Sequence, residues 1–174
     1  LLLVVVLFVI ALRALTFIAG YFVQTTGSPH MIDGMIDAKQ MKVIEVDPNI
    51  KGAKPISRSV NENGGLEFTW STWLFVDDLD YMKGSYKHVF HKGNDDFKTT
   101  GDFKGLNYPN NAPGLYFTPK GNNMVVVLNT FNDIVERITI ENIPMNKWYN
   151  VTIRVESQNV DIYVNGTTVN RHIL

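Results

Sequence analysis

The stretch WYNVTIRVESQNVDIYVNGTTV, residues 148–169, decides the fold. Its first half alternates apolar with polar side chains: Tyr149, Val151, Ile153 and Val155 against Asn150, Thr152 and Arg154. A period of two is typical of a half-buried β-strand. A second alternating run ends at Asn165-Gly166, the dipeptide that favours a type I′ turn, and Thr167 begins the return. The stretch therefore predicts a strand followed by a tight hairpin.

The same pattern continues upstream to about residue 60. Short runs rich in Val, Ile, Thr and aromatic residues are separated by Gly, Pro, Asn and Asp: LEFTWSTWLFV (66–76), YKHVFHKG (86–93), PGLYFTP (113–119), NMVVVLNT (123–130) and DIVERITI (133–140). In the first run Leu66, Phe68, Trp70, Leu74 and Val76 share one face, and Glu67, Thr69, Ser71, Trp73 and Phe75 share the other. We assign Trp70 and Trp148 to the core. Residues 60–174 are thus predicted to form an all-β sandwich or barrel.

Residues 1–23 differ sharply from the rest, because twenty of these twenty-three residues are apolar. As a helix they would rise about 34 Å, enough to cross a hydrocarbon core of about 30 Å. We predict a transmembrane helix, with a signal peptide and a buried core helix as the alternatives. Arg13 would lie near the middle of the span, either tolerated or paired with a carboxylate of a neighbouring helix.

Residues 24–59 are predicted to be a stalk or linker, since Pro29, Pro48 and Pro55 interrupt them. One alternating stretch, residues 41–46, could add an edge strand. The alternative is an ordered strap that folds along the domain.

Composition excludes several classes of function. Sixteen basic and seventeen acidic residues leave a net charge of −1, so there is no basic excess to neutralise phosphates and no nucleic-acid partner is expected. The chain has no cysteine, which removes disulfides, thiolate metal sites and cysteine nucleophiles.

The residue runs 68–75, 88–94, 113–130 and 146–166 resemble the concanavalin A-like jelly roll, and among its varieties the laminin-G-like domain. The opening of the domain, from Ser59 through Asn61, Gly64 and Gly65 to Trp73, resembles membrane-associated minor capsid proteins of large DNA viruses of algae and protists. This resemblance implies a non-enzymatic structural protein at the interface between an internal viral membrane and the capsid. Membrane lipid and other capsid or membrane proteins would be its partners. Family domains close with two further strands after the hairpin, so we expect a sandwich that is incomplete at the C-terminus. The missing part would be truncated, disordered or supplied by a partner's strand, and an unpaired edge is a ready site for strand addition.

The resemblance also implies candidate ligand sites. Laminin-G-like domains often bind calcium, and Asn94, Asp95 and Asp96 form the best local cluster, with Asn129 and Asp133 as distant contributors. The alternative function is a lectin-like receptor or adhesin that binds glycans, with or without calcium. Its site would combine aromatic and amide side chains: Trp73, Tyr108, Tyr116 and Asn110, with Asn107 and Asn111 nearby.

Other polar motifs carry less chemistry. Asn150 and Asn165 stand in the form of N-glycosylation acceptors. A regular strand would place His88 and His91 on opposite faces, which predicts that they cannot share a metal ion. The paired carboxylates of a glycosidase strand are not found, so no catalytic residue and no enzymatic activity are predicted, and no cofactor is required.

Overall fold

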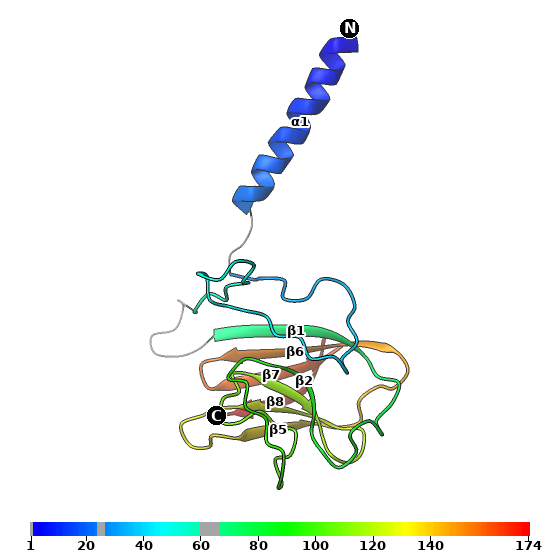
Figure 1. The fold of residues 1–174 in the computed structure, drawn as a ribbon, viewed down its shortest axis with the longest axis vertical. Coiled ribbons are helices and arrows are strands. Elements are labelled where there is room, and N and C mark those ends of the chain that lie inside the picture. The colour runs from blue at the N-terminus through cyan, green and yellow to red at the C-terminus, as the bar shows by residue number, and fades with distance from the viewer. Residues whose placement is uncertain (1, 24–26, 60–66) are drawn as a thin grey trace. The chain divides into compact units, whose positions relative to one another are not determined.

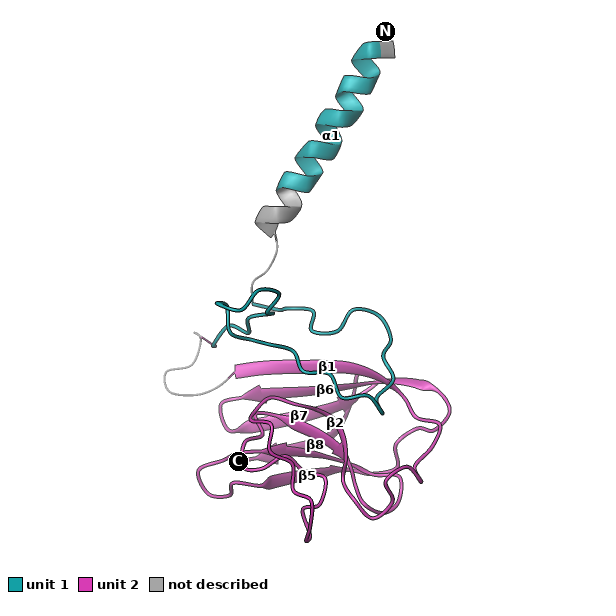
Figure 2. Cartoon of the chain, viewed as in Figure 1, with its two compact units in different colours: residues 1–58 teal, residues 59–174 magenta. Residues whose placement is uncertain are grey.

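The computed structural model describes residues 2–23, 27–59 and 67–174. The chain divides into two compact units, residues 1–58 and residues 59–174, and each is considered by itself (Figure 2).

The first unit contains a single helix, α1 (Leu2–Val23), among its described residues. Side chains are described from Leu3 to Ile18, and nearly all of them are large, apolar and exposed. Within the described part of the chain, no helix is long and apolar enough to cross a membrane. The predicted transmembrane helix over residues 1–23 is therefore not confirmed, and neither is a position of Arg13 inside a bilayer.

Residues 27–59 contain turns and bends but neither helix nor strand, so the prediction of an edge strand at residues 41–46 is wrong. The Nζ atom of Lys54 donates to the carbonyls of His30 and Met31, at 2.6 and 3.2 Å, and lies 2.8 Å from a carboxylate oxygen of Asp33. The backbone N–H of Lys54 donates to the carbonyl of Glu45. These bonds fold the segment back on itself.

The second unit consists of two antiparallel sheets of four strands each (Figure 1). The first sheet has the order β1-β6-β7-β8: β1 (Glu67–Phe75), β6 (Trp148–Glu156), β7 (Asn159–Val164) and β8 (Thr167–Ile173). The second sheet has the order β2-β3-β4-β5: β2 (Lys87–His91), β3 (Gly114–Phe117), β4 (Met124–Leu128) and β5 (Glu136–Ile140). The arrangement agrees with the predicted β-sandwich, whereas jelly-roll connectivity is not confirmed.

The main core lies between the two sheets. Its fully buried side chains come from β3, β4 and β5 on one side and from β6 and β7 on the other: Leu115, Met124, Val126, Ile138, Ile140, Tyr149, Val151, Ile153, Val160 and Ile162. On β1 the exposure alternates as the sequence predicted, and Trp70 stacks on Phe90 of β2 at 5.4 Å between ring centroids. Trp148 is 49% exposed, so its assignment to the core is wrong.

A second core covers the outer face of the second sheet. Residues 92–113 form a long connection whose Leu106 packs with Tyr116 of β3 and with Val125 and Val127 of β4. Both faces of β4 are consequently buried, which explains its uninterrupted apolar sequence MVVVL.

One edge of each sheet contacts the other sheet, whereas the β1 edge of the first sheet does not pair with a further strand among those described. At β5 and β8 they are joined by side chains, since Asn170 donates to the carbonyl of Thr139 and His172 Nε2 lies 2.9 Å from Glu136 Oε1. At the other end of the first sheet, β1 pairs with β6 on one side only among the strands that the structure describes. β1 is therefore a nine-residue edge strand.

Candidate functional site

Three aromatic side chains lie on the outer face of the first sheet, at the end of the β1–β6 pair. Trp73 is 63% exposed, Phe75 47% and Trp148 49%. Phe75 lies directly opposite Trp148 in the strand register, and residues opposite each other in an antiparallel pair point to the same face. We call Trp73, Phe75 and Trp148 the aromatic edge. Large apolar groups clustered in this way on a soluble domain mark interaction surfaces.

A polar ladder continues along the same face. Asn150 Nδ2 donates to Ser71 Oγ at 2.9 Å and to the carbonyl of Thr72 at 3.1 Å. Thr152 Oγ1 donates to Asn150 Oδ1 at 2.8 Å. These bonds hold the β1–β6 pair together beside the aromatic edge, so the aromatic side chains project from a fixed backbone.

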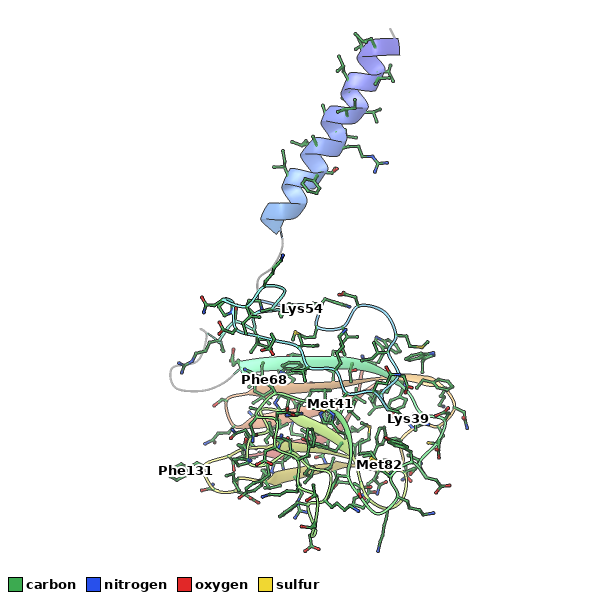
Figure 3. The ribbon with its side chains drawn as sticks, viewed as in Figure 1. Lys39, Met41, Lys54, Phe68, Met82 and Phe131 are labelled. Carbon is green, nitrogen blue, oxygen red and sulfur yellow. The ribbon has the colours of Figure 1, made fainter. Side chains whose placement is uncertain are left out.

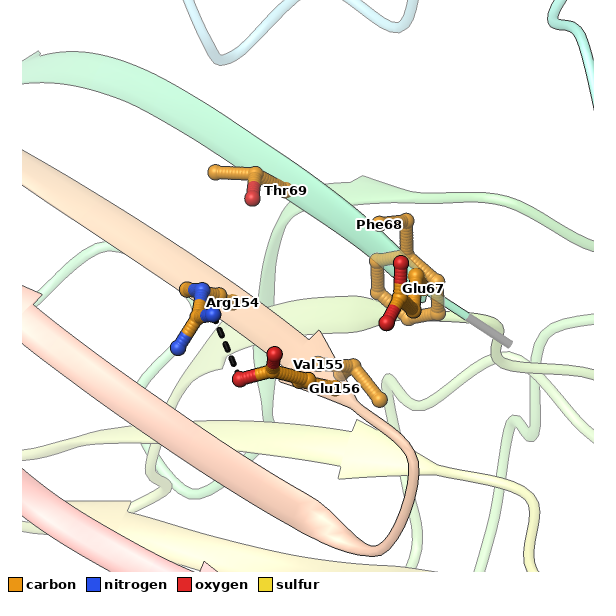
Figure 4. Close-up of a pocket in the computed structure, with 6 residues that line it drawn as sticks. All are labelled: Glu67, Phe68, Thr69, Arg154, Val155 and Glu156. Carbon is orange, nitrogen blue, oxygen red and sulfur yellow. Dashed lines mark hydrogen bonds and ion pairs between the residues drawn. The ribbon is translucent and has the colours of Figure 1, made fainter. Parts of the chain in front are cut away.

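Charged groups occupy the far end of this face. A hollow of about 240 Å³ is lined by Glu67, Phe68, Thr69, Arg154, Val155 and Glu156. Figure 4 shows these six side chains and the ion pair between Arg154 and Glu156. On β7, the buried Asp161 forms ion pairs with Arg171 and Arg154. The Nε atom of Arg171 lies 2.6 Å from Asp161 Oδ1. The hydrogen bond from Arg171 lowers the pKa of the Asp161 carboxyl below its usual value.

A pair of histidines lies on β2. A β-bulge between His88 and Phe90 shifts the register against β3, and His88 Nε2 comes within 2.7 Å of His91 Nδ1. The prediction that these two residues face opposite ways is therefore wrong, because the bulge changes the alternation of side chains. Burial, and to a smaller extent the neighbouring His91, lowers the pKa of His88 to about 4.

A network of asparagines holds the covering connection against β3. Asn94 accepts on its backbone carbonyl from Asn107 Nδ2, and on its side-chain oxygen from the backbone N–H of Asn110. The Tyr116 hydroxyl donates to Asn111 Oδ1, and Asn111 Nδ2 donates to the carbonyl of Asn107. Desolvation by burial raises the pKa of Tyr116. Asn107 Oδ1 is buried with no hydrogen-bond partner among the described residues.

The residues predicted for a carbohydrate site do not come together. Trp73 lies on the outer face of the first sheet, whereas Tyr116 is fully buried in the second core, on the other side of the sandwich. Tyr108 packs against that core with Lys98 Nζ 4.3 Å from its ring centroid, and Asn110 is exposed in the same connection.

The residues predicted for calcium binding and for glycosylation have the following surroundings. Both polar atoms of the Asn94 side chain bond to the backbone, at Tyr108 and Asn110, while Asp95 and Asp96 are exposed. Over the described residues there is no cluster of three or more histidine, cysteine or acidic side chains. Asn165 is exposed at the hairpin turn, and its Oδ1 accepts from the backbone N–H of Asn150.

Sequence alternation identified Trp73 and Phe75 as outward-facing, but it did not identify Trp148 or the histidine pair. A comparison with protein-family models, with curated proteins and with solved structures finds no match.

Proposed function

We propose that this chain is a non-enzymatic attachment protein. Its β-sandwich binds another protein through the aromatic edge and strand β1, and its apolar N-terminal helix holds the chain at a lipid membrane. The observation that carries the proposal is the exposure of Trp73, Phe75 and Trp148 beside an edge strand without a second partner among the described strands.

The aromatic edge has the composition of a protein-binding hot spot. Tryptophan is strongly enriched among the residues that dominate binding energies, because its large side chain buries much apolar surface. Trp73 and Trp148 come from neighbouring strands, and the ring centroids of Phe75 and Trp148 lie 5.7 Å apart, tilted by 51°. The tilt between these two rings means that they do not form a flat platform, which favours the side chains of a protein partner.

Strand β1 supplies a backbone surface next to that cluster. An edge strand presents unpaired N–H and C=O groups that can bond to an extended segment of another protein. β1 is nine residues long and contains neither proline nor lysine, which are common protecting devices at sheet edges. A partner strand paired with β1 could place alternate side chains against Trp73 and Phe75.

The helix supports attachment to lipid. Leu3, Phe8 and Phe17 are 73, 66 and 79% exposed, and apolar side chains surround the helix on all sides. A helix that is apolar all round is stable only when lipid or protein covers it. We favour lipid because it can cover a helix on every side, whereas a protein partner would cover mainly one face.

The nature of the assembly follows from the resemblance of residues 59–73 to minor capsid proteins. In the finer form of the proposal, a concanavalin A-like jelly roll ties an internal viral membrane to a capsid shell. The two antiparallel sheets are compatible with this class.

Liposome flotation tests the membrane part. The full chain should float with liposomes, and Leu7→Lys combined with Leu12→Lys should abolish flotation, because charged side chains are costly in hydrocarbon. Met41→Lys combined with Val43→Lys is the control, since Met41 and Val43 are as exposed as the two leucines but lie outside the helix. A wild-type chain that stays at the bottom of the gradient disproves lipid attachment.

Site-specific crosslinking tests the protein-binding part. A photoreactive phenylalanine analogue at position 73 or 148 should give one discrete adduct with a capsid protein in purified particles. The same analogue at Phe131, which is fully exposed away from the strands, should not. Equal adducts from position 131, or none from 73 and 148, would rule out the aromatic edge. Glycan-array binding lost in Trp73→Ala would replace the proposal with the lectin-like function.

A further inference from the structure

The histidine pair on β2 is a second candidate binding site, and it is separate from the aromatic edge. His88 and His91 are three residues apart, yet the bulge after His88 brings two ring nitrogens within 2.7 Å. Bulges are common next to functional sites because they redirect a side chain without ending the strand. Both imidazoles are partly exposed, so the pair can be reached from solvent.

The hydrogen bonds determine which nitrogen of His91 carries the proton. His91 Nε2 lies 2.8 Å from the backbone carbonyl oxygen of Asn94, which can only accept. His91 therefore donates from Nε2, and the lone pair on its Nδ1 points toward His88. Metal-ligating histidines very often donate their second ring nitrogen to a carbonyl, because this fixes the tautomer and the orientation of the ring.

From this geometry we propose that His88 Nε2 and His91 Nδ1 bind one divalent transition-metal ion, for which Ni²⁺ is the probe. Two nitrogen ligands, each about 2.0 Å from an ion, lie about 2.8 Å apart at adjacent corners of a square and about 3.3 Å apart in a tetrahedron. The two ring nitrogens, now 2.7 Å apart in a hydrogen bond, need only a small separation to reach either spacing.

Binding requires a small rearrangement. In the unbound pair His88 donates from Nε2, because His91 Nδ1 carries the lone pair. On binding, that proton is exchanged through solvent to His88 Nδ1, the hydrogen bond between the two imidazoles is replaced by two bonds to the ion, and both rings turn until their lone pairs meet. Within the described residues no third histidine or acidic group joins the pair, so water or an external ligand fills the remaining positions. Phe97 packs nearly perpendicular to both imidazoles, with ring centroids 5.2 and 5.3 Å away, so the two rings share one apolar neighbour.

Calorimetric titration of the full chain in detergent micelles with NiCl2 tests the site. We expect one ion per chain and at least a tenfold loss of Ni²⁺ affinity in both His88→Asn and His91→Asn. The matched controls are His30→Asn and His172→Asn, which remove the other two histidines of the chain and should leave the affinity unchanged.

An NMR titration of the wild-type chain keeps the test independent of whether the variants fold. Paramagnetic Ni²⁺ should broaden the imidazole resonances of His88 and His91 before those of His30 and His172. Absence of binding, simultaneous broadening of all four histidines, or loss of affinity in a control variant would each overturn the proposal.

Discussion

Trp148 lies directly opposite Phe75 across the β1–β6 pair, with ring centroids 5.7 Å apart, and both side chains remain about half exposed. The rings contact one another on the solvent side of the sheet rather than filling the core. Covering a large apolar side chain completely contributes about 1.5–3 kcal/mol. The aromatic edge therefore retains apolar surface that a partner can cover.

This position predicts a contrast between two tryptophans of the same strand. Trp73→Thr should change the free energy of unfolding by less than about 1 kcal/mol, since the ring is exposed and threonine suits a strand. Trp70→Thr should cost about 3 kcal/mol, because it removes the ring that stacks on Phe90 between the sheets. Chemical denaturation of both variants measures the difference. Equal losses would mean that Trp73 supports the fold rather than a partner.

The Tyr116 hydroxyl should matter more to stability than that of Tyr149, although both side chains are fully buried. Tyr116→Phe leaves Asn111 Oδ1 without its donor, which costs about 1–3 kcal/mol. Tyr149→Phe removes only a bond to the sulfur of Met124, a weak acceptor, and should cost less. Urea denaturation compares the two variants. Hydrogen exchange in residues 92–113 should rise in Tyr116→Phe alone, and an equal rise in Tyr149→Phe would contradict this assignment.

Much of the fold was predictable from local sequence. Each predicted run contains an observed strand, because alternation and turn residues act over only a few positions. The alternation on β1 even separated Trp70 from Trp73 correctly.

The errors arose where distant or irregular structure decides. Trp148 was predicted to be buried because most tryptophans are, but its position opposite Phe75 follows from a register with a strand about 75 residues earlier. His88 and His91 were predicted to lie on opposite faces because a regular period of two was assumed for a strand that contains a bulge. Tyr116 was predicted to bind carbohydrate at the surface, but residues 92–113 cover its side of the sheet. Neither a distant strand register, nor a bulge, nor a covering connection is marked by the residue pattern of the strand that it affects.

The hairpin between β7 and β8 should depend on Gly166. Asn165 and Gly166 have φ angles of 50° and 79°, the left-handed conformations of a type I′ turn. Gly166→Val should cost about 1–2 kcal/mol, because a β-branched residue is strained at positive φ. Asn165→Asp should be tolerated, because aspartate accepts that backbone angle and keeps an acceptor for the N–H of Asn150. Thermal unfolding distinguishes these outcomes, and unchanged stability in Gly166→Val would mean that the turn adopts another form.

Asp161 should contribute to stability above about pH 4 and lose its contribution in acid. Arg171 lowers the pKa of this carboxyl in the folded state, whereas the unfolded chain keeps the usual value of 3.8. The unfolded state therefore binds more protons between the two pKa values, and stability falls as the pH drops through that range. Asp161→Asn should be less stable at pH 7 and should show a weaker decline below pH 4. Asp80→Asn, at an exposed pair with Lys83, is the control and should leave the profile unchanged.

Lys54 should control the proteolytic resistance of residues 27–58. Its ammonium group joins the carbonyls of His30 and Met31 to the carboxylate of Asp33. Lys54→Met keeps most of the side chain's volume but removes these bonds, so the segment should open and be cleaved several times faster by a protease that does not cut at lysine. Lys51→Met is the matched control, because Lys51 is an exposed lysine of the same segment. Equal cleavage rates in the wild type and in Lys54→Met would show that Lys54 does not hold the segment together.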